Sequence, residues 1–349
     1  MRYIGVDLHK TNFVVCFLTE EEQSKLETFA LSPQGLAAFK RRLRREDQVA
    51  VETAPNTFYF YAQIKERVST IVVVDTYKFA LIAKSKKKTD RGDAQLLARF
   101  LKLGWLPTVP VPNQPIQQLR HLFQAREQLV GMMTQLKNMG HAALVRNGYA
   151  FGRAAFASLR SRERLAQLEG LSAADAQILA LALRQIADLE RELAALEAEI
   201  IRLGHGVAGV KRLLQIRGLN VLTAIGVLVE IGDIALFETS KQLVAYAGLA
   251  PSIRQSGGIE RRGKITKQGR KRLRTMVVHS VLALIRQPQT PLADFYARKK
   301  KEKGAGKAIC AAARKLLTIV FVMLKKNLDY WYIEDRLYNQ KLRALQKAA

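Results

Sequence analysis

Four acidic residues stand beside apolar runs in a chain that is otherwise strongly basic. They are Asp7 in YIGVDLHK, Glu52 in VAVETA, and Asp90 and Asp93 in KTDRGDAQLLA. Carboxylates at the ends of buried strands, with two more spaced one helical turn apart, supply the oxygen ligands that Mg²⁺ prefers. Each acid alone could be a helix cap or a solvated charge. The set of four predicts a site for Mg²⁺ or Mn²⁺.

The histidines give no comparable pattern. The chain has 5 of them, scattered without the spacing of a zinc site. His9 follows Asp7 by two residues and could lie near the metal, although the alternation of the hairpin favours a surface position for it.

The charge balance predicts a polyanionic partner. The chain carries 57 Lys and Arg residues against 30 Asp and Glu, for a formal charge of +27. The excess is concentrated in residues 251–349, which hold 24 basic and 6 acidic side chains. A field of this size attracts nucleic acid and releases its counterions on binding. The alternative is a surface that is merely well solvated.

Composition also excludes several classes of protein. The 349 residues, 48% of them hydrophobic, are enough for two or three domains with real cores. Cys16 and Cys310 are too few for a disulfide framework or a four-thiolate zinc site, and their apolar surroundings suit reduced thiols. No signal sequence is apparent, and the longest apolar stretches are too short to span a bilayer. We therefore expect a cytoplasmic protein with no membrane contact.

Apolar periodicity predicts an α/β domain over residues 1–115. Arg2–Leu18 is typical of a β-hairpin broken at residues 10–12, with Asp7 near the end of its first strand. Strands then alternate with helices, as in an α/β sheet. The expected elements are helices over 32–45, 59–68 and 90–103 and strands over 48–51 and 70–74. Gly104 and a Pro-rich stretch over 106–115 end the domain.

Residues 116–208 are expected to be a helical linker with a coiled-coil seam. Apolar residues step by three and four between Leu179 and Leu203, flanked by Glu and Arg. Two arrangements fit this pattern equally: a dimer contact, or one helix of an intramolecular antiparallel pair with the segment before it.

Residues 209–349 are expected to form a basic, all-α domain. The turn Arg217-Gly-Leu-Asn220 separates two apolar helical faces, in the manner of a helix-hairpin-helix. Such a turn can offer backbone N–H groups to a DNA phosphate. The alternative is a helical hairpin that only packs.

Ser256 is the candidate nucleophile of this domain. It precedes Gly257-Gly258 in an expected loop, and nine basic residues between Arg254 and Arg274 accompany one acid, Glu260. Neighbouring cations would stabilise both an attacking alkoxide and the charge developing on phosphorus. A turn serine bonded to its own backbone is the plainer interpretation. Ser252 is a competing candidate, and Tyr246 is expected in the core.

Other basic side chains are expected to contact phosphates without reading bases. These candidate nucleic-acid contacts are Lys86, Lys87, Lys88, Arg254, Arg261, Arg262, Lys264, Lys267, Arg270, Lys271 and Arg274.

Taken together, these motifs resemble the insertion sequence 110 family of transposases. IGVD7, VE52 and KTD90RGD93Axx-LA are similar to that family's acidic tetrad, and FETSKQLVAYAGLAP251 with the block from Arg254 to Arg274 resembles its second transposase domain. Both blocks occur in the family's order, so the resemblance covers nearly the whole chain. One departure is Thr53-Ala-Pro-Asn56, where the family commonly has a Thr-Gly turn.

The resemblance implies a ribonuclease-H-like N-terminal domain similar to Holliday-junction resolvases, in a bacterial or archaeal protein associated with the nucleoid. It also implies that Ser256 links covalently to DNA, and that a structured guide RNA pairs with donor and target DNA. A homodimer or homotetramer follows from the need to exchange strands between duplexes. We expect the acidic and serine domains to assemble one composite site.

Two alternatives remain open at this point. The first is a metal-dependent junction resolvase with water as nucleophile and a structural Ser256. The second is a non-catalytic nucleic-acid-binding protein.

Overall fold

The two apolar runs at the start of the chain form the antiparallel strands β1 (Arg2–Leu8) and β2 (Asn12–Thr19), as predicted. The computed structural model describes residues 1–76, 78–79, 89–256, 259–286 and 289–347, except for the side chains of Arg153, Arg254, Ser256 and residues 259–262. These residues form two compact units, Met1–Val111 and Pro112–Ala349, which are described separately.

The first unit is built on a mixed sheet of six strands in the order β3-β2-β1-β4-β5-β6. β1, β4 and β5 are mutually parallel, whereas β2, β3 and β6 run antiparallel to their neighbours. The remaining strands are β3 (Ser24–Ala30), β4 (Gln48–Glu52), β5 (Thr70–Val74) and β6 (Thr108–Val109). β4 and β5 match the predicted strands. β3 was not predicted, because its half-exposed residues lack a strong apolar alternation.

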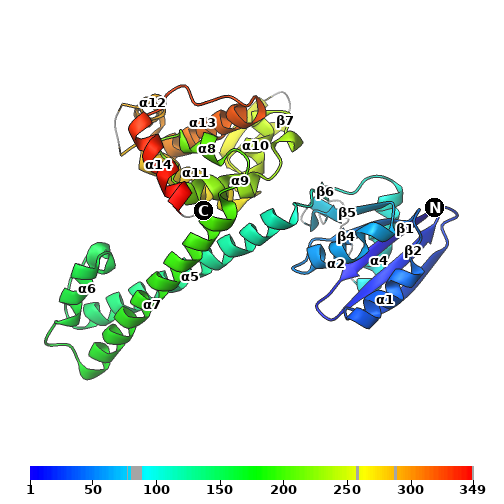
Figure 1. Cartoon of the computed structure of the whole chain (residues 1–349), viewed down its shortest axis with the longest axis horizontal. Coiled ribbons are helices and arrows are strands. Elements are labelled where there is room, and N and C mark those ends of the chain that lie inside the picture. Colours follow the sequence, from blue (N-terminus) through cyan, green and yellow to red (C-terminus); the bar gives the residue numbers. More distant parts are fainter. Residues whose placement is uncertain (77, 80–88, 257–258, 287–288, 348–349) are drawn as a thin grey trace. The chain divides into compact units, whose positions relative to one another are not determined.

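Helices cover both faces of this sheet, as the blue and cyan part of Figure 1 shows. α1 (Pro33–Arg42) and α2 (Thr57–Ile64, followed by the short turn Lys65–Arg67) cover one face. They bury Phe39 and Phe60 against alternate residues of β1 and β4. α4 (Asp90–Lys102) packs on the opposite face through its alanines and leucines. The predicted α/β character of this part of the chain is confirmed.

The second unit begins with two long helices that lie side by side, α5 (Gln114–Arg146) and α7 (Ala173–Gly204) (Figure 1). They run antiparallel, because Arg126 early in α5 contacts Glu197 late in α7 at 2.7 Å. The short helices η2 (Arg153–Phe156) and α6 (Leu159–Ala166) connect them. The predicted apolar seam of α7 therefore packs against α5 of the same chain, with Leu179 and Ile186 buried.

The remainder of the second unit is a helical domain with one β-hairpin. Its core gathers around α13 (Ala305–Lys325), whose Leu316 and Leu317 are buried. The other helices are α8 (Val210–Leu214), α9 (Val221–Ile231), η3 (Ile234–Leu236), α10 (Ser240–Tyr246), α11 (Lys271–Leu284), α12 (Pro291–Lys303) and α14 (Asp335–Lys347).

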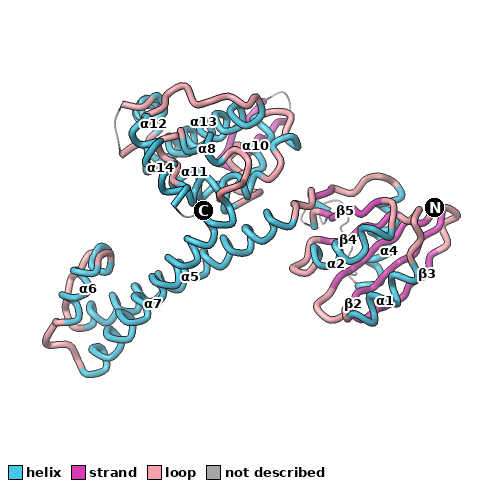
Figure 2. The backbone as a smooth tube through the Cα atoms, viewed as in Figure 1, coloured by secondary structure: helices cyan, strands magenta, loops and turns pink. Residues whose placement is uncertain are grey.

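The hairpin corrects the all-α expectation for this region. β7 (Pro251–Ser256) pairs antiparallel with β8 (Ile259–Ile265), as the magenta strands beside α10 in Figure 2 show. Ser256 accordingly ends a strand instead of standing in a loop. Polar and basic residues dominate both strands, so the apolar alternation that reveals a strand in a sequence is missing.

Both cysteines are free thiols that are at least partly buried. Cys16 is buried in β2, and burial raises the pKa of its thiol to about 11, whereas Cys310 is only half-buried. In the part of the chain that the structure describes, none of the helices combines the length and apolarity needed to cross a membrane.

Candidate metal centre and serine hairpin

Asp7 and Glu52 lie at the carboxyl ends of neighbouring parallel strands. Val6 of β1 pairs with Val51 of β4, so the next residues, Asp7 and Glu52, lie at the same level of the two strands. Residues two apart in a strand share a face. Asp7 therefore shares the face of Gly5, which α4 covers. Glu52 likewise shares the face of Ala50, which packs in the same apolar cluster as α4 residues.

α4 carries the other two acids in its first turn. Thr89 caps the helix, its Oγ1 accepting a hydrogen bond from Gly92 N at 3.2 Å. Asp90 and Asp93 follow, where the helix dipole favours negative charge. The cap fixes the residue at which the helix starts, and hence the direction in which Asp90 projects.

Gly5 brings α4 close to the sheet. A Cβ at this position would lie 2.0 Å from the carbonyl oxygen of Ala94 and 2.6 Å from the amide nitrogen of Ala98. Both atoms belong to the backbone of α4, so only glycine permits this approach. The contact places the start of α4 beside the end of β1.

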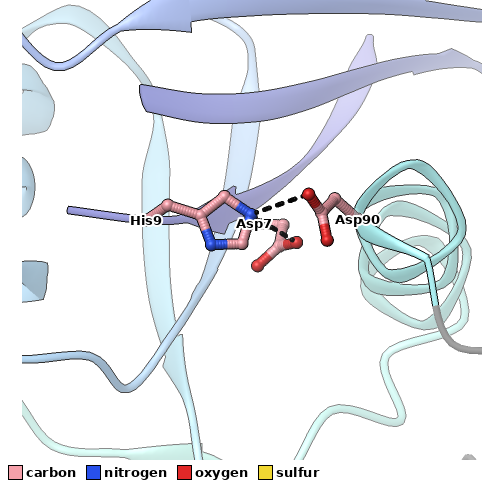
Figure 3. A group of neighbouring side chains, drawn as sticks. All are labelled: Asp7, His9 and Asp90. Atoms are coloured by element: carbon pink, nitrogen blue, oxygen red, sulfur yellow. Dashed lines mark ion pairs between the residues drawn. The ribbon is translucent and has the colours of Figure 1, made fainter. Parts of the chain in front are cut away.

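Asp7 and Asp90 meet at this position, together with His9 (Figure 3). Nε2 of His9 is 3.3 Å from Oδ2 of Asp7 and 3.2 Å from Oδ2 of Asp90. One ligand atom from each residue lies within 4.8 Å of the others. Within the described ranges, this is the one such group of three among His, Cys, Asp and Glu side chains. Asp93 lies on α4 with Asp90, and Glu52 lies on the neighbouring strand β4, but neither belongs to this group.

His9 lies beside the predicted acids, which is the less favoured of the two positions expected from the sequence. The signal was present: residues 3, 5 and 7 share one face of β1, and His9, one residue past the end of the strand, continues this alternation toward α4. Its backbone is fixed on both sides, because His9 N donates to Asn12 O at 2.9 Å and Asn56 Nδ2 donates to His9 O at 2.8 Å. Asn56 belongs to the Thr53–Asn56 loop that departs from the family pattern.

The donor set suits a divalent cation. Two carboxylates and one imidazole are ligands that Mn²⁺ and other divalent ions accept, and Mg²⁺ accepts the carboxylates. Two ligands at right angles, each about 2.1 Å from an ion, are about 3 Å apart. The separations at His9 Nε2, 3.2 and 3.3 Å, are close to that value.

The serine hairpin is anchored at its base by backbone hydrogen bonds. Thr266 N donates to Ala250 O at 2.9 Å, Lys267 N to Gly248 O at 3.1 Å and Arg270 N to Tyr246 O at 2.8 Å. The backbone of Ser256 pairs with Ile259 at the far end of the hairpin. Ser252, the competing candidate nucleophile, is exposed on β7. Its Oγ lies 2.4 Å from the position that a Cβ on residue 263, now Gly263, would occupy.

Two family models match this chain. Residues 4–147 match a transposase family with a DEDD domain, and residues 210–297 match the transposase family IS116/IS110/IS902. The first stretch contains all four predicted acids, and the second contains Ser256. The chain belongs to the insertion sequence 110 family of transposases.

Relatives of the transposase extend along most of its length. It is 24% identical to the transposase for insertion sequence element IS1111A of Coxiella burnetii, covering 95% of this chain and 91% of the relative. It is 28% identical to the "Probable family 20 transposase" of Pseudomonas aeruginosa, over 68% and 71% of the two chains. It is also 25% identical to the pilin gene-inverting protein of Moraxella bovis, over 93% and 96%.

The candidate nucleic-acid contacts of the transposase divide into three groups. Lys86, Lys87 and Lys88 lie outside the described residues, as do the side chains of Arg254, Arg261 and Arg262. The exposed group is Lys264, Lys267 and Lys271.

Arg270 and Arg274, the third group, make contacts inside the protein. Arg270 Nε donates to the hydroxyl of Tyr246 at 2.8 Å. Arg274 Nη1 donates to the carbonyl oxygens of Ala247 at 2.9 Å and Lys267 at 3.2 Å. Both arginines therefore stabilise the base of the hairpin through these hydrogen bonds.

A buried ion pair next to that base was missed by the sequence analysis. Glu230, at the end of α9, is 2% exposed and accepts a hydrogen bond from Arg272 Nη1 at 2.6 Å. Arg272 Nη2 also reaches Glu127 of α5 at 3.0 Å. Tyr246 packs against the same core, as predicted. No sequence spacing joins Glu230, Arg272 and Glu127, because they come from three different helices.

The helical turn over Arg217–Asn220 joins α8 to α9 as expected, and its contacts are with other helices. A Cβ on Gly218 would lie 2.4 Å from Ser280 O in α11. Lys341 of α14 donates to the carbonyl oxygens of Leu214 and Ile216 at 3.0 and 2.8 Å, and burial lowers its pKa to about 8. Close packing thus accounts for Gly218 without a phosphate.

Proposed function

We propose that this transposase cuts and rejoins double-stranded DNA through a serine–DNA link, assisted by Mg²⁺ or Mn²⁺. Asp7, Glu52, Asp90 and Asp93 would hold the cation and Ser256 would be the nucleophile. The observation that carries the proposal is the meeting of Asp7 and Asp90, which come from a strand end and a helix start. Two carboxylates brought this close repel each other unless a cation neutralises them.

The fold of the first unit supports the same proposal. A ribonuclease-H-like domain needs acids from adjacent strands and from a helix on one face of a sheet. The register of β1 with β4 and the docking of α4 on Gly5 support this assignment of Asp7, Glu52, Asp90 and Asp93.

The chemical step conserves phosphoester bonds. The Oγ of Ser256 attacks phosphorus, a P–Oγ bond forms, and the P–O bond to the adjoining sugar breaks. The serine proton ends on the sugar oxygen that leaves. Rejoining reverses the step with a new sugar hydroxyl, so no external energy source is needed. A bound Mg²⁺ or Mn²⁺ would stabilise the charge on the phosphoryl oxygens.

The partners follow from the charge and from the relatives. A formal charge of +27 suits donor DNA, target DNA and a structured guide RNA. The relative named as a pilin gene-inverting protein supports a reaction that ends in rejoined DNA, because inverting a gene requires both cutting and rejoining. We further propose that the transposase acts as a homodimer or homotetramer, since strand exchange needs several active sites. We also propose that it acts in the cytoplasm.

Covalent trapping tests the serine step. The transposase is incubated with a nicked suicide DNA, guide RNA and Mg²⁺, and protein–DNA adducts are separated under denaturing conditions. We expect an adduct from wild-type protein and from the matched control Ser252→Ala, and none from Ser256→Ala. An adduct that survives Ser256→Ala contradicts the assignment of the nucleophile.

The same assay tests the acidic site. Asp7→Asn and Asp90→Asn should each reduce adduct formation by at least about a hundredfold, as expected for the loss of electrostatic stabilisation at the reacting phosphate. Full activity of both variants would refute the metal role. Cleavage without any adduct in wild-type protein would instead identify a resolvase that uses water.

A further inference from the structure

His9 has the position of a metal ligand, although no motif marks it as one. It follows β1 on the face that carries Asp7, and its ring points toward both Asp7 and Asp90 (Figure 3). The side chain is 39% exposed, yet its Nε2 atom is shielded from solvent and makes no hydrogen bond of good geometry. A shielded nitrogen facing two carboxylates is a donor atom directed at a cation position.

The backbone holds His9 there independently of its ionic contacts. The amide of His9 donates to Asn12 O and its carbonyl accepts from Asn56 Nδ2, at 2.9 and 2.8 Å. The residue is thus attached to both the β1–β2 turn and the loop before α2. Such preorganisation is typical of residues that must keep a ligand in place.

We propose that Nε2 of His9 coordinates the divalent cation together with Asp7 and Asp90, and that this nitrogen makes the site prefer Mn²⁺ to Mg²⁺. The proposal rests on the metal role proposed above. Mg²⁺ strongly favours oxygen ligands, whereas transition ions accept imidazole. The alternative is that His9 is only a cationic partner that neutralises the two acids.

The two roles predict opposite effects of removing the ring. If His9 is a ligand, His9→Ala lowers Mn²⁺ affinity by at least about tenfold and leaves Mg²⁺ affinity nearly unchanged. If His9 is only a counter-charge, its loss removes a competitor for the carboxylates. The affinity for both ions would then stay the same or rise.

Mn²⁺ binding to the full-length protein, measured by electron paramagnetic resonance in a nitrogen-free buffer, tests this. Echo modulation from ¹⁴N should appear in wild-type protein and vanish in His9→Ala and His9→Gln. The control His205→Ala, an exposed histidine at the end of α7, should keep it. Asn56→Ala should weaken the modulation, because it releases the carbonyl of His9. Circular dichroism confirms that each variant is folded.

The outcomes separate this proposal from the metal role itself. Mn²⁺ that binds wild-type protein and is lost in Asp7→Asn, but shows no ¹⁴N modulation, overturns the ligand role of His9 and leaves the metal site standing. Equal loss of Mn²⁺ and Mg²⁺ affinity in His9→Ala also overturns the proposed preference. Absence of Mn²⁺ binding to wild-type protein overturns both proposals.

Discussion

Gly5 shows how one residue positions a site to which it contributes no side chain. It lies two residues before Asp7, and the backbone of α4 occupies the space of its missing Cβ. The sequence motif IGVD therefore combines a ligand with the glycine that lets the second ligand-bearing element approach.

Gly5→Ala should destabilise the first unit by about 2–3 kcal/mol, because the new methyl group would overlap backbone atoms that cannot rotate away. Hydrogen exchange of the β1 and α4 amides measures the loss. Gly131→Ala is the matched control: it lies within α5, nothing stands within 4 Å of its Cβ position, and alanine should stabilise that helix by up to about 1 kcal/mol. Equal protection in wild-type and Gly5→Ala proteins would show that α4 does not need this contact.

Among the elements, the pair α5 and α7 is held at one end by a polar cluster around Asp175. This carboxylate accepts hydrogen bonds from Arg146 Nε at 3.0 Å, Asn147 Nδ2 at 2.8 Å and Ser172 Oγ at 3.0 Å. The hydrogen bond from Arg146, with those from Asn147 and Ser172, lowers the pKa of Asp175 from 3.8 to about 2. The cluster joins the end of α5 to the start of α7.

A lowered carboxylate pKa means that the folded state binds a proton less readily than the unfolded state. The stabilisation is therefore fully present above pH about 4 and is lost as the pH falls through about 2. Asp175→Asn should weaken hydrogen-exchange protection at the start of α7 at neutral pH, and the difference from wild type should shrink below pH 4. Asp188→Asn, an exposed acid paired with Arg191 on the same helix, should change little. A deficit in Asp175→Asn that does not vary with pH would argue against this charge effect.

For the molecule as a whole, the formal charge of +27 leads us to expect that electrostatics dominate binding to nucleic acid. Three exposed lysines stand in this region: Lys264 in β8, Lys267 after the strand and Lys271 at the start of α11. In the same stretch Arg270, Arg272 and Arg274 make internal contacts. The basic block that looks uniform in the sequence thus divides into residues for packing and residues available to phosphates.

Replacing Lys264, Lys267 and Lys271 together with Gln should weaken DNA binding and flatten its salt dependence. Each phosphate contact contributes about 0.9 to the slope of log K against log salt, so the slope should fall by up to about 3. Fluorescence anisotropy over a salt series measures it. Lys65→Gln in the first unit, an exposed lysine beside Glu66, should leave the slope within error. A triple variant with the wild-type slope would exclude these lysines from the interface.

Much of the architecture was predictable because neighbouring residues encode it. The alternation of β1 and β2, the apolar runs of β4 and β5, the start of α4 at Asp90 and the seam of α7 are all local patterns, and the structure confirms each of them. The four acids could be nominated from their own short motifs for the same reason, whereas Ser256 was favoured as nucleophile only through the family resemblance.

The tertiary structure decided the relations between distant segments. It paired α7 with α5, placed β7 and β8 in a hairpin, joined Glu230 to Arg272, and brought His9 to Asp7 and Asp90. Each of these depends on strand register or on how closely two helices or a helix and a sheet can approach. How closely two elements approach depends on the volume of side chains that are far apart in the chain, as at Gly5. The hydrophobic periodicity of a single segment does not contain this information.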